Sequence, residues 1–228
     1  SNGSAAGVAT HTRFPEGKRI AMGNVRHCKE DALGDREFEH LLEGAHRIPS
    51  PRNFDARFAI LLAGRLGLRG GVIAHISSDW INWRKQRIEI LYYERCTKGK
   101  DGGLCGYCIQ QAQQMAAADT PVTFEQAKET MWSPKTENSA RKVPFDASTR
   151  AAIIVERFFE RYEEWPVSRT AVNRRVSTAT DFAPELRQKR VYPHALRATA
   201  ATYWAGKGLD VYALQGMIEI RAHTPVFP

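Results

Sequence analysis

The 228-residue sequence lacks any apolar run near the roughly 18 to 20 residues that span a bilayer, and no signal-peptide-like apolar stretch opens it. These absences predict a soluble protein of the cytoplasm without a membrane partner. Acidic side chains are also in deficit, since 25 Asp and Glu stand against 33 Lys and Arg. The net charge of +8 makes a polyanion such as nucleic acid the first partner to consider.

Cysteine is scarce, with only Cys28, Cys96, Cys105 and Cys108 in the chain. A basic intracellular protein of this length keeps its thiols reduced, so disulfide bonds are not expected. The last three lie in "ERCTKGKDGGLCGYC", where a CxxC pair follows a third cysteine. This spacing suits zinc if a fourth ligand comes from elsewhere, but neither Cys28 nor His75 stands out as that ligand. A glycine-rich loop of reduced thiols is the alternative.

Apolar periodicity divides the chain. Residues 1–34 are rich in Gly, Ser and Ala without sustained periodicity, and we interpret them as a flexible basic arm before a domain at 35–228. Helical spacing predicts helices from Asp35 and Asn53, and again from Ser148 onwards. Between them lie the β-like runs "DWINW", "QRIEILYY" and "ARKVPF", the last two separated by an excursion with an Ala- and Gln-rich helix. This order predicts a mostly helical α+β domain with a small three-stranded antiparallel sheet.

Four basic side chains could carry chemistry. His194 and Arg197 lie three apart in "YPHALRATAATYWAGKGLD", on one face of a helix whose first turn suits Pro193. Arg69 follows an apolar helix, among glycines that allow close approach of a ligand. Lys135 lies in the polar turn "PKTENSARKVPF". Taken singly, each has an ordinary explanation as a solvated, ion-paired or helix-end residue.

Taken in chain order, these pieces resemble the catalytic domain of the tyrosine recombinases, or phage integrase family, over roughly residues 35–220. The stretches "GRLGLRGGVIAHISSDWI", "WSPKTENSARKVPF" and "YPHALRATAATYWAGKGLD" look most like archaeal, especially haloarchaeal, integrase-like members. The resemblance implies DNA strand cleavage and rejoining through a phosphotyrosine, without a cofactor. It also implies that the partners are double-stranded DNA and other recombinase protomers.

The same resemblance assigns the catalytic roles. Arg69 and Arg197 would stabilise negative charge on the non-bridging phosphate oxygens. His194 would donate to the phosphate or handle the proton of the nucleophile, and Lys135 would protonate the leaving 5′ oxygen.

The sequence departs from the family pattern at three places. Val72 stands where an acidic residue commonly follows the first arginine. Glu219 and Ile220 occupy the places of a Gly-His or Gly-Trp pair, and the nucleophilic tyrosine would fall just past Pro228. Residues 1–34 are too few for the N-terminal DNA clamp. These departures predict a truncated or degenerate catalytic domain, and the alternative function is a catalytically inactive DNA-binding integrase remnant.

Two tyrosines follow Arg197 within the chain. Tyr203 and Tyr212 fall on stretches that we interpret as packed helix, which favours structural roles for both.

Basic residues gather before the HxxR motif. Residues 166–197 hold seven Lys or Arg against two acidic residues. Contacts with DNA phosphates are expected from five of them: Arg174, Arg175, Arg187, Lys189 and Arg190. A third hypothesis is a zinc-assisted nucleic-acid module unrelated to recombination. It rests on the basic arm and the cysteines.

Overall fold

The computed structural model describes residues 31–118, 122–134 and 140–218. Nearly all of the predicted arm lies outside the described residues, and so do Lys135, Glu219 and Ile220. The division into an arm at 1–34 and a domain at 35–228 therefore stays a prediction. None of the described helices is long and apolar enough to cross a membrane.

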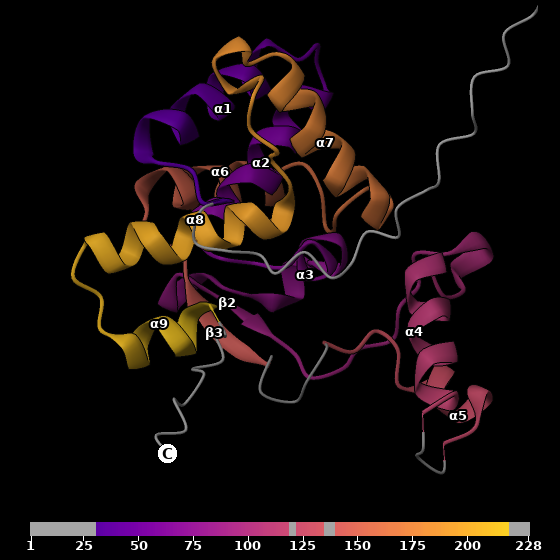
Figure 1. Cartoon of the computed structure of the whole chain (residues 1–228). Helices are drawn as coiled ribbons and strands as arrows, with labels where there is room; N and C mark the ends of the chain where they lie inside the picture. The colour runs from indigo at the N-terminus through magenta and orange to yellow at the C-terminus, as the bar shows by residue number, and fades with distance from the viewer. Residues whose placement is uncertain (1–30, 119–121, 135–139, 219–228) are drawn as a thin grey trace, which may run out of the picture.

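Five helices form the body of the molecule, which lies above the sheet in Figure 1. They are α1 (Asp35–Arg47), α2 (Arg52–Gly64), α6 (Thr149–Phe159), α7 (Arg169–Asp181) and α8 (Pro193–Gly206). Helix α2 packs against the other four, and its residues from Phe58 to Gly64 are all buried. A helix that is apolar on every side belongs at the centre of a core, which explains this position. The helices predicted from Asp35, Asn53 and Ser148 onwards are confirmed.

A three-stranded antiparallel sheet lies under the body. Its strands are β1 (Ile81–Asn82), β2 (Arg87–Ile90) and β3 (Arg141–Pro144), in the order β1-β2-β3. Ile88 of the central strand lies opposite Ile81 on one side and Val143 on the other. Helix α9 (Val211–Ile218) packs against β3. The predicted sheet is confirmed, although each strand is shorter than its β-like run.

The short helix α3 (Gly70–His75) connects the body to the sheet and packs against α7. The predicted position of Arg69, directly after an apolar helix, differs from the observed one. Helix α2 already ends at Gly64, and Arg69 directly precedes the first turn of α3. Gly67, at a φ of 65°, reverses the chain between the two helices. The two glycines that open α3 are poor helix formers, so no helix was predicted here.

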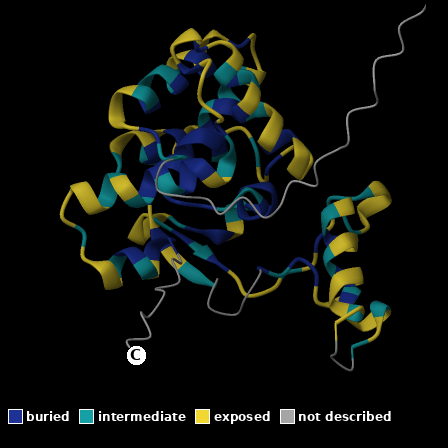
Figure 2. Cartoon of the chain, viewed as in Figure 1, coloured by how far each residue is buried: buried dark blue, intermediate teal, exposed yellow. Residues whose placement is uncertain are grey.

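Residues 91–134, here called the insert, stand beside the body in Figure 1. The insert contains α4 (Gly106–Ala116) and α5 (Phe124–Glu129), which pack mainly against each other. Helix α4 is the predicted Ala- and Gln-rich helix, whereas α5 was not predicted. Figure 2 shows mostly exposed and intermediate residues along both helices, while buried residues fill the centre of the body. Burial therefore holds the body together far more than it holds the insert.

Candidate active site

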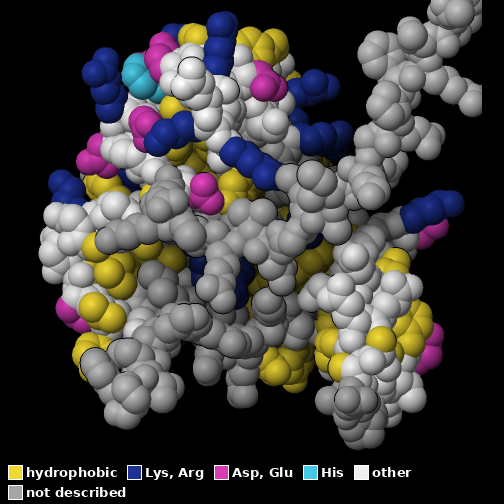
Figure 3. All heavy atoms as spheres, viewed as in Figure 1, with side chains coloured by type: hydrophobic (Ala, Val, Ile, Leu, Met, Phe, Trp, Pro, Cys, Tyr) yellow, Lys and Arg dark blue, Asp and Glu magenta, His cyan; other side chains and the backbone are white. Residues whose placement is uncertain are grey.

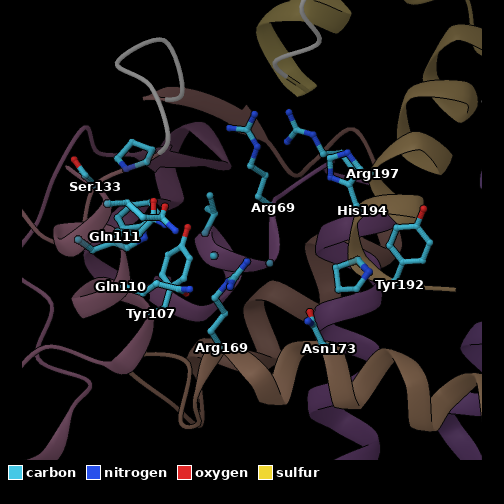
Figure 4. A pocket seen from close by; sticks show the side chains of 17 residues that line it. Arg69, Tyr107, Gln110, Gln111, Ser133, Arg169, Asn173, Tyr192, His194 and Arg197 are labelled. Atoms are coloured by element: carbon cyan, nitrogen blue, oxygen red, sulfur yellow. The ribbon is translucent and has the colours of Figure 1, made fainter. Parts of the chain in front are cut away.

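A cleft of about 620 Å³ opens between α3, α7, α8 and the insert. Four side chains that carry or can accept positive charge line it: Arg69, Arg169, His194 and Arg197 (Figure 4). No acidic side chain is among the described residues that line the cleft. Cations gathered in a concave site without a carboxylate favour an anionic group such as a phosphate.

Arg197 is held in place by backbone carbonyl groups. Its side chain is buried on α8, where Nη1 donates to the Gly67 carbonyl at 2.7 Å and Nη2 donates to the Ile218 carbonyl. Bonds to two separate segments fix the plane of the guanidinium group. Helix α9 thereby contributes to the site, because Ile218 is its last residue.

Arg69 reaches the same cleft because α3 and α8 begin close together. A β-carbon added at Gly70 would lie 3.7 Å from Cβ of Pro193, the first residue of α8. Pro193 does occupy the first helical turn, as its sequence position predicts. In Figure 4 the side chains of Arg69 and Arg197 point toward the same part of the cleft, with His194 beside Arg197.

The other positions of the family pattern fall around this cleft. Lys135 lies outside the described residues, but Pro134, directly before it in the chain, is buried in the cleft wall. Val72, at the position where the family commonly has an acidic residue, is 3% exposed and packs in the hydrophobic core. Val72 is therefore an ordinary core residue of α3 that also reaches the cleft.

Two cleft residues were missed by sequence analysis. Arg169 begins α7, and its Cζ atom lies 4.0 Å from the centre of the Tyr107 ring. Burial raises the pKa of the Tyr107 phenol, although the charge of Arg169 works in the opposite direction. Arg169 belongs to the basic stretch of residues 166–197, so the sequence shows its charge. No pattern in the sequence predicts that the insert packs near α7.

The two tyrosines that follow Arg197 do not line the cleft. The Tyr203 ring packs under the buried Arg65 guanidinium at 4.0 Å, which agrees with a structural role. Tyr212 is 85% exposed, so its assignment to packed helix was wrong. It lies in the first turn of α9, whose buried residues come later in the helix. The tyrosines that do line the cleft are Tyr107 and Tyr192.

The basic stretch contains two kinds of cation. Arg174, Arg187 and Arg190 are exposed, and Figure 3 shows Lys and Arg side chains around α1 and α7. Arg175 instead pairs with the buried Asp55 carboxylate, with Nη2 at 3.2 Å from Oδ2. Lys189 pairs with Glu37, with Nζ at 2.7 Å from Oε1. Arg175 therefore has a structural partner that sequence analysis did not identify.

A second cluster lies behind the cleft wall. The side chains of His75, Cys96, Cys105 and Cys108 bring their ligand atoms within 4.8 Å of one another, an arrangement that could hold a metal ion. The structure has Cys96, Cys105 and Cys108 as free thiols. His75 supplies the fourth candidate ligand atom, which the sequence left unassigned. Its contribution was hidden because it comes from α3, 21 residues before Cys96.

No protein-family model and no curated protein matches the sequence. The structure matches the Tn1549 transposon integrase in complex with a circular intermediate DNA, with a TM-score of 0.56 and 14% identity over 83% of this chain. It also matches the XerA recombinase, with a TM-score of 0.51 and 16% identity over 82% of this chain. The fold is that of a tyrosine-recombinase catalytic domain. The chain spans 57% and 55% of the lengths of those two structures.

Proposed function

We propose that this chain is the catalytic domain of a site-specific DNA recombinase or integrase of the tyrosine type, similar to archaeal integrase-like members. The observation that carries the proposal is the shared cleft of Arg69, His194 and Arg197, which come from distant parts of the sequence in the order expected for the family. The DNA complexes of the Tn1549 integrase support double-stranded DNA as the partner.

Each basic residue has a role in the proposed reaction. The planar donor groups of Arg69 and Arg197 bind the non-bridging oxygens of the scissile phosphate and stabilise the charge of the transition state. His194, exposed at the cleft, donates to the phosphate or moves the proton of the nucleophile. Lys135 delivers a proton to the leaving 5′ oxygen. Arg169 adds a fifth basic group on the insert side of the cleft.

Strand transfer of this type needs no metal or organic cofactor, because a phosphotyrosine conserves the energy of the broken phosphodiester. A metal at the His75 cluster would serve the structure, since its ligands face one another rather than the cleft phosphate site. Other protomers of the same recombinase are proposed partners, because strand exchange joins two DNA duplexes.

The second candidate function is DNA binding without cleavage, and the described tyrosines favour it. Neither Tyr203 nor Tyr212 lines the cleft. Tyr192 does, but its hydroxyl donates to Asp31 at 2.7 Å. Tyr107 also lines the cleft, but its ring is engaged by Arg169, whose Cζ atom lies 4.0 Å from the ring centre. The basic residues of the cleft can lower the barrier only for an attack that some nucleophile makes.

A nicked suicide substrate separates the two functions. The full chain is incubated with the labelled DNA, denatured, and examined for a band in which protein stays attached. Binding in a mobility-shift assay together with such a band supports the recombinase function, whereas binding without a band supports the second function. A band that disappears in Tyr107→Phe or Tyr192→Phe would assign the nucleophile, with Tyr203→Phe and Tyr212→Phe as matched controls. Absence of DNA binding at low salt would contradict both functions.

A further inference from the structure

The cluster of His75 and three cysteines has the dimensions of a tetrahedral metal site. The Nε2 atom of His75 lies 3.5, 3.6 and 3.3 Å from the sulfur atoms of Cys96, Cys105 and Cys108. Zn–S bonds of about 2.3 Å and a Zn–N bond of about 2.0 Å at tetrahedral angles place nitrogen and sulfur about 3.5 Å apart. The three nitrogen–sulfur distances therefore suit a bound zinc ion, and all four ligand atoms lie within 4.8 Å of one another.

The imidazole of His75 is oriented for metal binding. Its Nδ1 atom lies 2.8 Å from the Gly71 carbonyl oxygen, which can only accept a hydrogen bond. The proton is therefore on Nδ1, and the lone pair of Nε2 points at the three sulfur atoms. The ring also stacks on Trp132, with centroids 5.0 Å apart, so it cannot easily turn away. This is the outer-shell support typical of a histidine that binds a metal.

The three cysteines are also held by backbone structure. Cys105 precedes the first turn of α4 and Cys108 lies within that turn, so the CxxC pair shares one helix end. The Cys96 amide donates to the Met131 carbonyl at 2.9 Å, which joins the two ends of the insert. One ligand thus comes from α3, one from the entry of the insert and two from α4.

The insert needs such a link, because it buries little apolar surface of its own. Among its described residues, the buried apolar side chains are Cys96, Cys108, Ala112, Ala127, Met131, Trp132 and Pro134. A unit of about 40 residues with so small a core usually requires a metal or disulfides to hold one conformation.

We propose that His75, Cys96, Cys105 and Cys108 bind one structural zinc ion that fastens the insert to α3. An all-N/S tetrahedral set of three thiolates and one imidazole is a ligand set typical of structural zinc. Zinc binds the thiolates, so the three thiol protons are released to solvent when the ion enters. The complex of Zn²⁺ and three thiolates carries a charge of −1, and the neutral imidazole adds none.

This position connects the metal site to the cleft. Helix α3 begins directly after Arg69 and ends at His75, so the ion fixes one end of a six-residue helix whose other end carries the proposed catalytic arginine. Tyr107 lies between the two α4 ligands and lines the cleft. Zinc therefore positions both the α3 wall and the insert wall of the cleft.

The metal content of the full chain tests the proposal. The protein is purified from medium that contains both zinc and iron, without chelator, and its metals are measured by mass spectrometry. We expect one zinc per chain. Cys108→Ser and His75→Gln each remove one ligand and should lower zinc affinity by at least about 100-fold, more than the 10- to 100-fold effect of losing an outer-shell partner. Cys28→Ser and His46→Gln are the matched controls and should keep full zinc.

Thiol titration gives a reading that does not depend on DNA. With zinc bound, we expect Cys28 to react with a thiol reagent while the three ligand cysteines are protected. After chelation all four cysteines of the chain should react, and trypsin should cut the insert before it cuts the body. Stoichiometric iron, absence of metal, or a Cys105–Cys108 disulfide in the freshly purified protein would each overturn the proposal.

The effect on the cleft rests on the proposed DNA function and is measured separately. Zinc-depleted protein should bind duplex DNA at least about threefold more weakly than the zinc-loaded protein, and zinc should restore the affinity. If zinc is present but neither form binds DNA, the recombinase proposal fails while the metal site stands. If zinc-free protein binds DNA normally, the link between metal and cleft fails.

Discussion

The helical body and the insert are stabilised in different ways. In the body, Phe58 stacks on Phe158 with centroids 3.7 Å apart, Trp165 lies next to both rings, and all three side chains are at most 1% exposed. In the insert, α4 and α5 pack mainly against each other. The insert contacts the rest of the chain around His75 and through Lys98, whose Nζ donates to the Trp165 carbonyl at 2.7 Å. The cleft takes its walls from both regions. On the body side, packed helices carry the arginines, and carbonyl groups hold the Arg197 guanidinium. Tyr107 depends on a few polar and aromatic contacts.

The largest expected effect separates the two regions by stability. Phe58→Ala leaves a cavity in the aromatic cluster and should lower the free energy of unfolding by about 3–5 kcal/mol. The matched variant Phe124→Ala, in the half-buried first turn of α5, should lower it by less than about 1 kcal/mol and loosen only the insert. Chemical denaturation measures the first effect, and hydrogen exchange localises the second. Equal losses would show that body and insert unfold as one unit.

A second comparison lies within one helix, between neighbouring arginines. Arg175→Gln leaves the 5% exposed Asp55 without its cation. Breaking a fully buried pair costs about 3–5 kcal/mol, and the partial exposure of Arg175 reduces the expected loss of stability to about 2–3 kcal/mol. Arg174→Gln, at an exposed position, should change stability by less than about 0.5 kcal/mol.

For DNA binding we expect the opposite ranking, in which the change at Arg174 has the larger effect and the change at Arg175 the smaller one. If Arg174 contacts a phosphate, its loss lowers the slope of log affinity against log salt by about 0.9, while Arg175→Gln leaves the slope unchanged. Mobility shifts at several salt concentrations measure both slopes. A larger change for Arg175 than for Arg174 would place the DNA on the other side of α7.

The sequence predicted the body better than the insert, for a physical reason. Helices such as α1 and α2 carry their apolar pattern within one segment, and the HxxR spacing puts His194 and Arg197 on one helical turn wherever the helix packs. The position of His75 beside three cysteines depends on how α3, a loop and α4 fold against one another. No periodic pattern within one segment predicts a contact of this kind. The contact of the Arg169 guanidinium with the Tyr107 ring could not be predicted for the same reason. The ion pair of Arg175 with Asp55 was hidden likewise, since 120 residues separate them.

The contact of Arg169 with Tyr107 is the test of how firmly the insert wall is tied to α7. Removing either partner should increase tryptic cleavage of the insert, with a coupling free energy of about 0.5–2 kcal/mol in a double-mutant cycle. Arg169→Gln should also weaken DNA binding about three- to tenfold, because it removes a cleft charge. Tyr107→Leu keeps that charge and should leave the salt slope unchanged. If the two changes add without coupling, the ring contact does not hold the insert.

The smallest expected effect concerns Lys189, whose ammonium group is shared between Glu37 and any DNA phosphate. The hydrogen bond from Lys189 lowers the pKa of the Glu37 carboxyl, and the Gly34 amide adds to this effect against the cost of burial. A carboxyl with a lowered pKa contributes stability above its unfolded-state pKa and loses it as pH falls through its folded-state pKa. The ion pair is therefore complete at neutral pH and competes with DNA there. As a partly exposed pair it is worth at most about 1 kcal/mol.

Glu37→Gln should release Lys189 and raise DNA affinity at low salt by no more than about threefold, while the loss of stability on acidification becomes shallower. The matched control is Glu39→Gln. Glu39 lies on the same helix α1 as Glu37, but it pairs with Arg150 of α6, away from the basic stretch. Both variants remove one negative charge, so a general electrostatic effect raises affinity equally in the two. A rise confined to Glu37→Gln places Lys189 on the DNA surface. Equal rises, or none, remove Lys189 from the residues that contact DNA and leave that role to the exposed arginines of α7 and the segment before α8.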